Sequence, residues 1–112
     1  MIREILQPPG WPRPKGYANG IAATGRLVFT AGVIGWNERE EFEADTLAGQ
    51  FERVLENIVA ILAQAEARPE HIVRMTAYVT DRDAYLEQAR DIGAAWKRSA
   101  RSMRSSSARS VP

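Results

Sequence analysis

The chain contains few side chains that could carry out chemistry. It has one histidine, His71, and no cysteine. A cysteine nucleophile, a cysteine-based metal site, a histidine cluster for a metal ion and a Ser-His-Asp triad are therefore excluded, because each lacks necessary parts. We interpret His71 as a half-exposed residue at the start of a strand.

Acidic residues gather in one stretch, from Glu38 to Asp45, which holds five carboxylates and Arg39. Carboxylates at suitable spacing could bind calcium, but this spacing does not match a calcium-binding loop. A solvated turn is the favoured interpretation. The sequence thus predicts no metal site.

Basic residues are concentrated at the other end of the chain. All 14 acidic residues and 10 of the 15 basic residues lie within residues 1–96, which gives that part a net charge of −4, whereas residues 97–112 carry +5. All six serines fall between Ser99 and Ser110. Such a basic arm would attract phosphate, although it has no aromatic side chain after Trp96 on which a base could stack.

The C-terminal segment also lacks the apolar residues of a strand or helix core. Only Met103 and Val111 are large and apolar there, too few to bury a segment. We therefore expect one domain over residues 1–96, apparently incomplete, and a Ser/Arg-rich, disordered tail over residues 97–112. A shift of reading frame just after Trp96 or Lys97 is one hypothesis for this change of composition.

Two helices should position the reactive groups. Apolar residues recur at steps of three and four from Leu47 to Leu62, with Asp45 or Thr46 able to cap the helix start, so we expect a helix ending near Ala65. Asp81 is the expected cap of a second helix, whose inward stripe is Leu86, Ala89, Ile92 or Gly93, and Trp96.

Strands are expected on either side of the first helix. Residues 21–23 and 27–31 read as a β-hairpin, after a loop rich in proline. Residues 72–80 alternate, with Val73, Met75, Ala77 and Val79 on a wholly apolar face that should receive the helices. The opposite, mixed face suits a subunit interface, a cleft or solvent.

Four segments together resemble the RidA family, also called the YjgF family. Gly16-Tyr17-Ala18-Asn19-Gly20 is similar to its Gly-x-Tyr-x-x-Gly loop, and Leu27-Val28-Phe29-Thr30-Ala31-Gly32 to its strand that ends in Ser-Gly, with Ala31 in place of the serine. The helical segment from Gln50 to Ile58 and the strand segment from Ile72 to Asp81 are also similar to segments of the family, and all four segments follow in the family's order. The resemblance covers residues 1–96.

The resemblance implies an α/β (α+β) fold of the chorismate-mutase-like type. A mixed sheet would carry two helices on one face, here without its last two strands, and three subunits would form a homotrimer with clefts at their interfaces. The resemblance further implies hydrolysis of reactive 2-enamine and 2-imine acids to 2-keto acids and ammonia, with no cofactor.

The site that the resemblance implies is only partly recognisable. Tyr17, Ala31 and Gly32 match positions beside the family's cleft, and Gly32 could offer a backbone amide to the substrate. The family's carboxylate-binding arginine follows its second helix, and here only Arg101 and Arg109 weakly echo that motif, without the strand that should follow. No catalytic residue is assigned, and we expect the activity to be impaired.

Other functions remain open at this stage. A member that binds small molecules or proteins without catalysis is one alternative, and an RNA-binding or translation-inhibiting member is another. The composition, 45% hydrophobic over 112 residues, fits one domain without a membrane span, and a cytoplasmic location is the default expectation.

Overall fold

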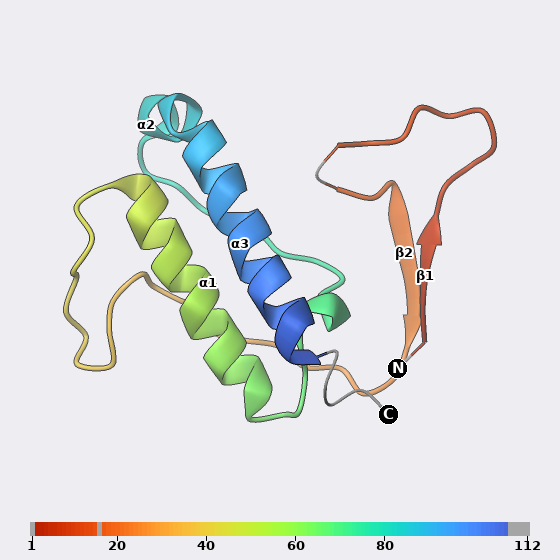
Figure 1. Cartoon of the computed structure of the whole chain (residues 1–112), viewed down its shortest axis with the longest axis horizontal. Coiled ribbons are helices and arrows are strands. Elements are labelled where there is room, and N and C mark those ends of the chain that lie inside the picture. Colours follow the sequence, from red (N-terminus) through yellow and green to blue (C-terminus); the bar gives the residue numbers. More distant parts are fainter. Residues whose placement is uncertain (1, 16, 108–112) are drawn as a thin grey trace.

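The core of the protein lies between two long helices. A computed structural model describes residues 2–15 and 17–107, and in it α1 (Leu47–Ala63) and α3 (Ala89–Ser107) pack side by side (Figure 1). Leu55 and Leu62 from α1 and Ile92 and Ala95 from α3 are the buried apolar residues. These side chains supply the hydrophobic contact that joins the two helices.

The start of α1 is fixed by two side-chain caps. The Thr46 hydroxyl accepts a hydrogen bond from the backbone N–H of Gly49 at 3.0 Å, and the Gln88 side-chain oxygen accepts one from the N–H of Ala48 at 2.9 Å. Both amides belong to the first turn, where a helix has no internal acceptor for them. The predicted helix and its Thr46 cap are confirmed.

The second predicted helix is divided into two. Asp81 caps α2 (Arg82–Glu87) by accepting from the N–H of Ala84 at 3.0 Å, as expected, but α2 ends at Gln88 and α3 begins directly afterwards. The break takes Leu86 out of the predicted inward stripe, and this side chain is 55% exposed. Ile92 keeps its predicted place in the core.

The sheet differs from the predicted hairpin. β1 (Ile2–Leu6) pairs antiparallel with β2 (Gly20–Thr24), with Ile5 opposite Ile21. The prediction that residues 21–23 pair with residues 27–31 is wrong, because β2 pairs with β1 instead and the chain turns away from the sheet at Gly25, at a φ of 143° that favours glycine. The proline-rich segment forms the connection between β1 and β2.

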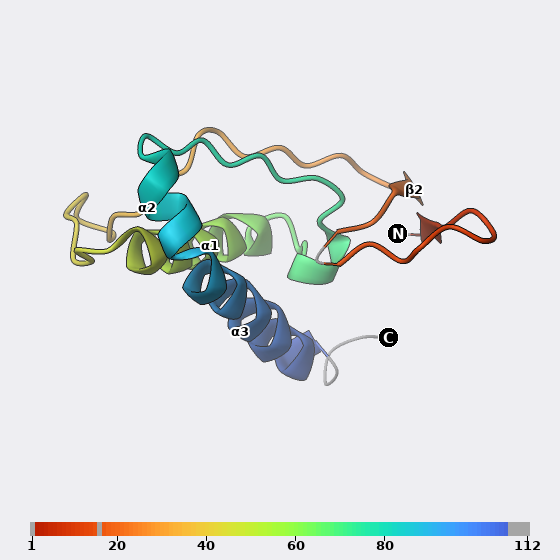
Figure 2. The same cartoon turned by 90° about the horizontal axis from the view of Figure 1, so that it is seen from above.

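Two extended segments lie along one side of the helices without pairing. Figure 2 shows residues 26–34, in orange, and residues 72–80, in teal, in a layer beside α1. Within the described part of the chain, residues 27–33 and 73–80 make no backbone–backbone hydrogen bond. The predicted strand over residues 72–80 is therefore wrong as a strand, because an extended segment becomes a strand only with a partner.

The unpaired layer leaves much of the surface uncovered. The accessible surface is 9123 Å², about half as much again as the roughly 6,200 Å² expected for a folded monomer of this mass. The radius of gyration is 15.3 Å, against about 13 Å for a compact domain of this length. The helices and the extended layer together enclose only a small core.

The architecture agrees with the predicted fold class. The protein is mixed α/β, with a two-stranded antiparallel sheet and helices α1, α2 and α3. The expectation of an α/β fold with an incomplete sheet is confirmed. No helix among the described residues has the length and apolar character needed to cross a membrane.

The segment predicted as a tail begins inside a helix. The backbone of α3 continues across Trp96 and is helical through Ser107, although the sequence placed a boundary at residue 96. Residues 108–112, which complete the predicted disordered tail, lie outside the described residues. The division into a domain and a tail stays a prediction.

Replacing Leu55 by alanine tests the helix-pair core. Leu55 is 3% exposed, so Leu55→Ala should lower the free energy of unfolding by about 2–5 kcal/mol. Leu86→Ala makes the same chemical change at an exposed position and should change it by at most about 0.5 kcal/mol. Urea denaturation followed by circular dichroism measures both, and equal losses in the two variants would contradict this core.

Candidate functional site

A hollow beside the first half of α1 is the candidate site with the most defined geometry. It has a volume of about 260 Å³ and is lined by Gly35, Asn37, Glu43, Ala44, Gly49, Glu52, Arg53 and Glu56. Residues 35–44 supply one wall, and the first turns of α1 supply the other. Gly35 permits this close approach, because a Cβ there would lie 2.6 Å from the backbone oxygen of Gln50.

Asn37 organises the acidic turn at the mouth of this hollow. Its side chain is buried, its Oδ1 accepts from the N–H groups of Arg39 at 2.9 Å and Glu41 at 3.0 Å, and its Nδ2 donates to Glu43 at 2.6 Å. The backbone of Asn37 closes the same turn with Glu41 and Glu40. The five-carboxylate stretch is thus a turn on the surface, as the sequence predicted.

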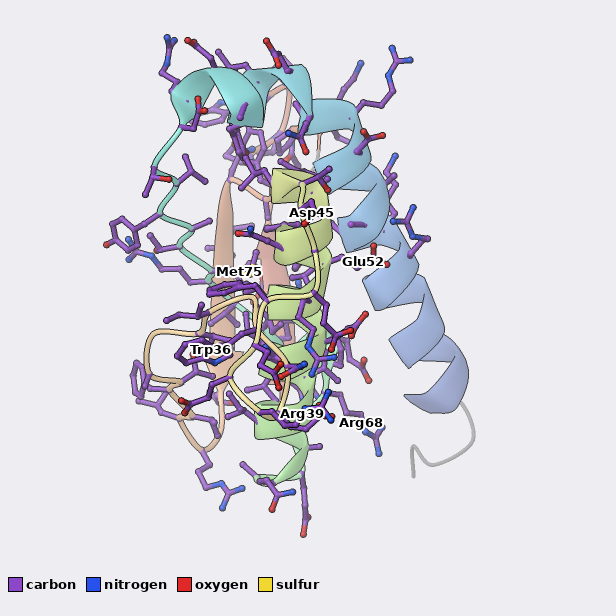
Figure 3. All side chains as sticks on the ribbon, turned by 90° about the vertical axis from the view of Figure 1, so that its left-hand side faces the viewer. Trp36, Arg39, Asp45, Glu52, Arg68 and Met75 are labelled. Carbon is purple, nitrogen blue, oxygen red and sulfur yellow. The ribbon has the colours of Figure 1, made fainter. Side chains whose placement is uncertain are left out.

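Two polar residues of α1 hold the extended chain against the helix. Asn57 donates through Nδ2 to the backbone oxygens of Ile34 at 2.9 Å and Trp36 at 2.8 Å, and Arg53 donates to the oxygen of Trp36 at 3.2 Å. Arg53 and Asn57 are four residues apart and therefore share a face of α1. Figure 3 shows Trp36 and Arg39 along this side of the helix.

The charged side chains in and around the hollow are already paired. Arg53 forms ion pairs with Glu38 at 3.1 Å and Glu56 at 3.5 Å, and Glu52 pairs with Arg98 of α3 at 3.2 Å. Figure 3 shows Glu52 on the side of α1 that faces α3. The pKa of Glu38 is lowered, chiefly because its own backbone N–H donates to the carboxylate and then because Arg53 donates to it.

The charge of the hollow decides what it can bind. Three carboxylates, those of Glu43, Glu52 and Glu56, line it together with a single cation, Arg53. An anionic ligand would meet net negative charge there and would have to displace a carboxylate from Arg53. The hollow is therefore unsuited to the carboxylate of a 2-imino or 2-keto acid. The described residues contain no group of three side chains that could hold a metal ion.

The residues predicted from the resemblance lie elsewhere, on separate segments. Tyr17 is 70% exposed in the connection between β1 and β2, and Ala31 and Gly32 lie in the unpaired segment that follows β2. A Cβ at Gly32 would meet no atom within 4 Å. None of these residues lines the hollow.

The predicted cations have no described side-chain position. Arg101 belongs to the α3 backbone, its side chain is outside the described set, and Arg109 and the Gly16 of the loop motif lie outside the described residues altogether. His71 is half-buried at the end of η1 (Pro69–His71), where its Nδ1 accepts from the N–H of Arg68 at 3.1 Å. The predicted strand start at His71 is therefore wrong, since the residue closes a helical turn.

Three polar residues that organise this region were not predicted from the sequence: Asn37, Arg53 and Asn57. A signal was present for the last two, because polar residues at positions 53 and 57 flank the otherwise apolar periodic stripe of α1. Asn37 gave no such signal, since an asparagine before an acidic run is common in any turn.

Comparisons with known proteins agree on one family. A sequence model of the family described as Endoribonuclease L-PSP matches residues 12–111. A RutC family protein of Pyrococcus abyssi is 33% identical over 82 residues, which are 72% of this chain and 65% of that protein. A RutC family protein of Aquifex aeolicus is 33% identical over 87 residues, 77% of this chain and 68% of that protein.

These matches differ in how much of the relative and how much of this chain they cover. The aligned part of the chain spans slightly less than two thirds of the Pyrococcus relative. The family match reaches residue 111 and so includes the segment that the sequence set apart as a tail. No solved structure matches the chain.

Asn37→Ala tests whether the turn depends on this buried amide. The change leaves the N–H groups of Arg39 and Glu41 without their acceptor, so the free energy of unfolding should fall by about 1–3 kcal/mol. Asn19→Ala removes a single exposed hydrogen bond, to Gln7, and should change it by at most about 0.5 kcal/mol. Thermal unfolding of both variants distinguishes them, and a harmless Asn37→Ala would refute the assignment.

Proposed function

Because the chain belongs to the Endoribonuclease L-PSP family, which includes the RidA (YjgF) proteins, we propose that it derives from hydrolytic deaminases of 2-enamine and 2-imine acids and that its own activity is low. In this reaction water adds to the imine carbon, the carbon–nitrogen bond breaks, and a 2-keto acid and ammonia leave. The reaction needs a cation for the substrate carboxylate, a positioned water and a group that transfers protons.

One observation carries the proposal of low activity: the matching residues do not form a closed site. Tyr17 is 70% exposed, and the surroundings of Gly32 are open. A hydrogen bond offered to the substrate from such positions competes with bulk water and contributes little. The hollow beside α1 carries the wrong charge for a carboxylate.

Assembly with other subunits would supply a second wall for the substrate cleft. We propose the cytoplasmic homotrimer that the resemblance implies, with clefts between subunits. The high exposure of Tyr17 and of Tyr78, which is 94% exposed, supports contact with another chain, because large aromatic side chains are enriched at interfaces. The substrate would then be a small 2-imino acid bound without a cofactor.

A second candidate function is weak binding of single-stranded RNA through α3. Its backbone is helical over Ala89–Ser107, so positions 98, 101 and 104, all arginines, recur at steps of three on one side of the helix. No acidic residue follows Asp91 in the sequence, and Arg98 is the one of the three that pairs with a described carboxylate, that of Glu52 in α1. The description of the family as Endoribonuclease L-PSP supports a nucleic-acid partner.

Ammonia release from freshly generated 2-aminoacrylate and 2-iminopropionate tests the first proposal. The purified chain should release ammonia at a rate close to the buffer background, because Arg53, the cation that lines the hollow, is already paired with Glu38 and Glu56. Circular dichroism on the same sample confirms that α1 and α3 are folded during the assay. Deamination well above background by the folded chain would sink the proposal of low activity.

The RNA candidate predicts a specific dependence on salt. The double variant Arg101→Ala/Arg104→Ala should weaken binding to a single-stranded RNA and reduce the slope of log K against log salt by about 1.4, or about 0.7 for each lost cation. Arg13→Ala/Lys15→Ala removes two cations from the β1–β2 connection and serves as the matched control. Fluorescence anisotropy measures both, and equal slopes in all three proteins would reject α3 as the binding surface.

A further inference from the structure

Asn19 differs chemically from the other two asparagines of the chain. It precedes a glycine, Gly20, whereas Asn37 precedes a glutamate and Asn57 an isoleucine. A glycine has no Cβ, so its backbone nitrogen is open to approach by the side chain of the residue before it. The pair Asn19-Gly20 is therefore the place in this sequence where an asparagine side chain can most readily react with the backbone.

The surroundings of the three asparagines differ in the same direction. Asn57 lies within α1, where the amide that follows it is bonded in the helix. Asn37 is 5% exposed, and both its Oδ1 and its Nδ2 are hydrogen-bonded. Asn19 is exposed in the connection between β1 and β2, so water and dissolved bases reach it.

Asn19 also completes a chain of hydrogen bonds that holds the proline-rich connection. Its Nδ2 donates to Oε1 of Gln7 at 3.0 Å, and Nε2 of Gln7 donates to the backbone oxygens of Trp11 at 2.9 Å and Pro12 at 3.4 Å. Figure 1 shows this connection, in red, beyond the ends of β1 and β2. The Gln7 amide keeps this orientation because residue 19 supplies a donor to its oxygen.

From these observations we propose that Asn19 is a site of spontaneous deamidation and that its deamidation releases the connection between β1 and β2. The backbone nitrogen of Gly20 attacks Cγ of Asn19, so that a nitrogen–carbon bond forms and the bond from Cγ to Nδ2 breaks. The amide proton of Gly20 passes to a base in solution, and Nδ2 takes up a proton and leaves as ammonia. Water then opens the resulting succinimide ring to aspartate or isoaspartate.

The new carboxylate reverses the hydrogen bonding at Gln7. A carboxylate only accepts hydrogen bonds, so it attracts Nε2 of Gln7 and draws this donor away from Trp11 and Pro12. The isoaspartate product also adds one carbon atom to the backbone directly before β2, which disturbs the pairing of Gly20 with Leu6. Both products loosen the connection and leave the core between α1 and α3 unchanged.

Incubation of the purified full chain at physiological pH and temperature tests the reaction. The formal net charge should fall from +1 to 0 as one carboxylate is gained, and peptide mass mapping should place the change at Asn19, with Asn37 and Asn57 intact. Gly20→Ala puts a Cβ beside the attacking nitrogen, 3.2 Å from the flexible end of Leu6. It should slow the reaction about tenfold, equivalent to about 1.4 kcal/mol in the barrier. An unchanged Asn19 after several weeks, or equal rates in the parent and Gly20→Ala, would overturn the proposal.

Trypsin cleavage after Lys15 tests the release of the connection. Asn19→Asp supplies the product carboxylate in a uniform sample and should be cleaved there about fivefold faster than the parent, equivalent to about 1 kcal/mol of lost hydrogen bonding. Gln7→Ala removes the contacts to Trp11 and Pro12 directly and should match Asn19→Asp. Asn19→Ala leaves Nε2 of Gln7 in place and should be cleaved more slowly than Asn19→Asp. The release is overturned if Asn19→Asp is cleaved no faster than the parent or no faster than Asn19→Ala.

Discussion

The contact between α1 and α3 is the interaction on which the rest of the structure depends. Leu55 and Leu62 of α1 and Ile92 and Ala95 of α3 are the buried apolar residues of the described chain. Polar contacts attach several neighbouring segments to this pair. Gln88 caps the start of α1 from the corner between α2 and α3, and Asn57 and Arg53 bind the chain around Trp36. A protein built in this way has an ordered helical half and an extended half whose apolar side chains remain largely exposed.

Because of this division, the match to the family extends over most of the chain, whereas the residues implied in substrate binding do not form one site. The family match covers residues 12–111, whereas the residues that the resemblance assigns to substrate binding lie in exposed segments that the helices do not enclose. The hollow beside α1 is lined by three carboxylates whose partners are already in place. An anion is disfavoured there by charge alone.

The helices could be predicted from the sequence because their signals are local. Thr46 and Asp81 cap helices with amides only three residues away, and the apolar period of α1 needs no distant partner to be recognised. The strand predictions were wrong because strand pairing depends on contacts that are not local in the sequence. Whether residues 21–23 pair with residues 27–31 or with β1 is not settled by the local pattern, and alternation along residues 72–80 cannot reveal that the segment beside them forms no backbone hydrogen bonds with them. The turn around Asn37 was missed because a single amide, rather than a pattern, organises it.

In the single chain, α1 and α3 hold the fold while residues 27–33 and 73–80 stay unpaired. Residue-resolved amide hydrogen exchange at a concentration low enough to keep the chain monomeric tests this claim most directly. The amides of α1 between Leu55 and Leu62 should exchange most slowly, whereas those of residues 27–33 and 73–80 should exchange almost as fast as in an unfolded peptide. Slow exchange at residues 27–33 or 73–80 in the dilute chain would contradict the account.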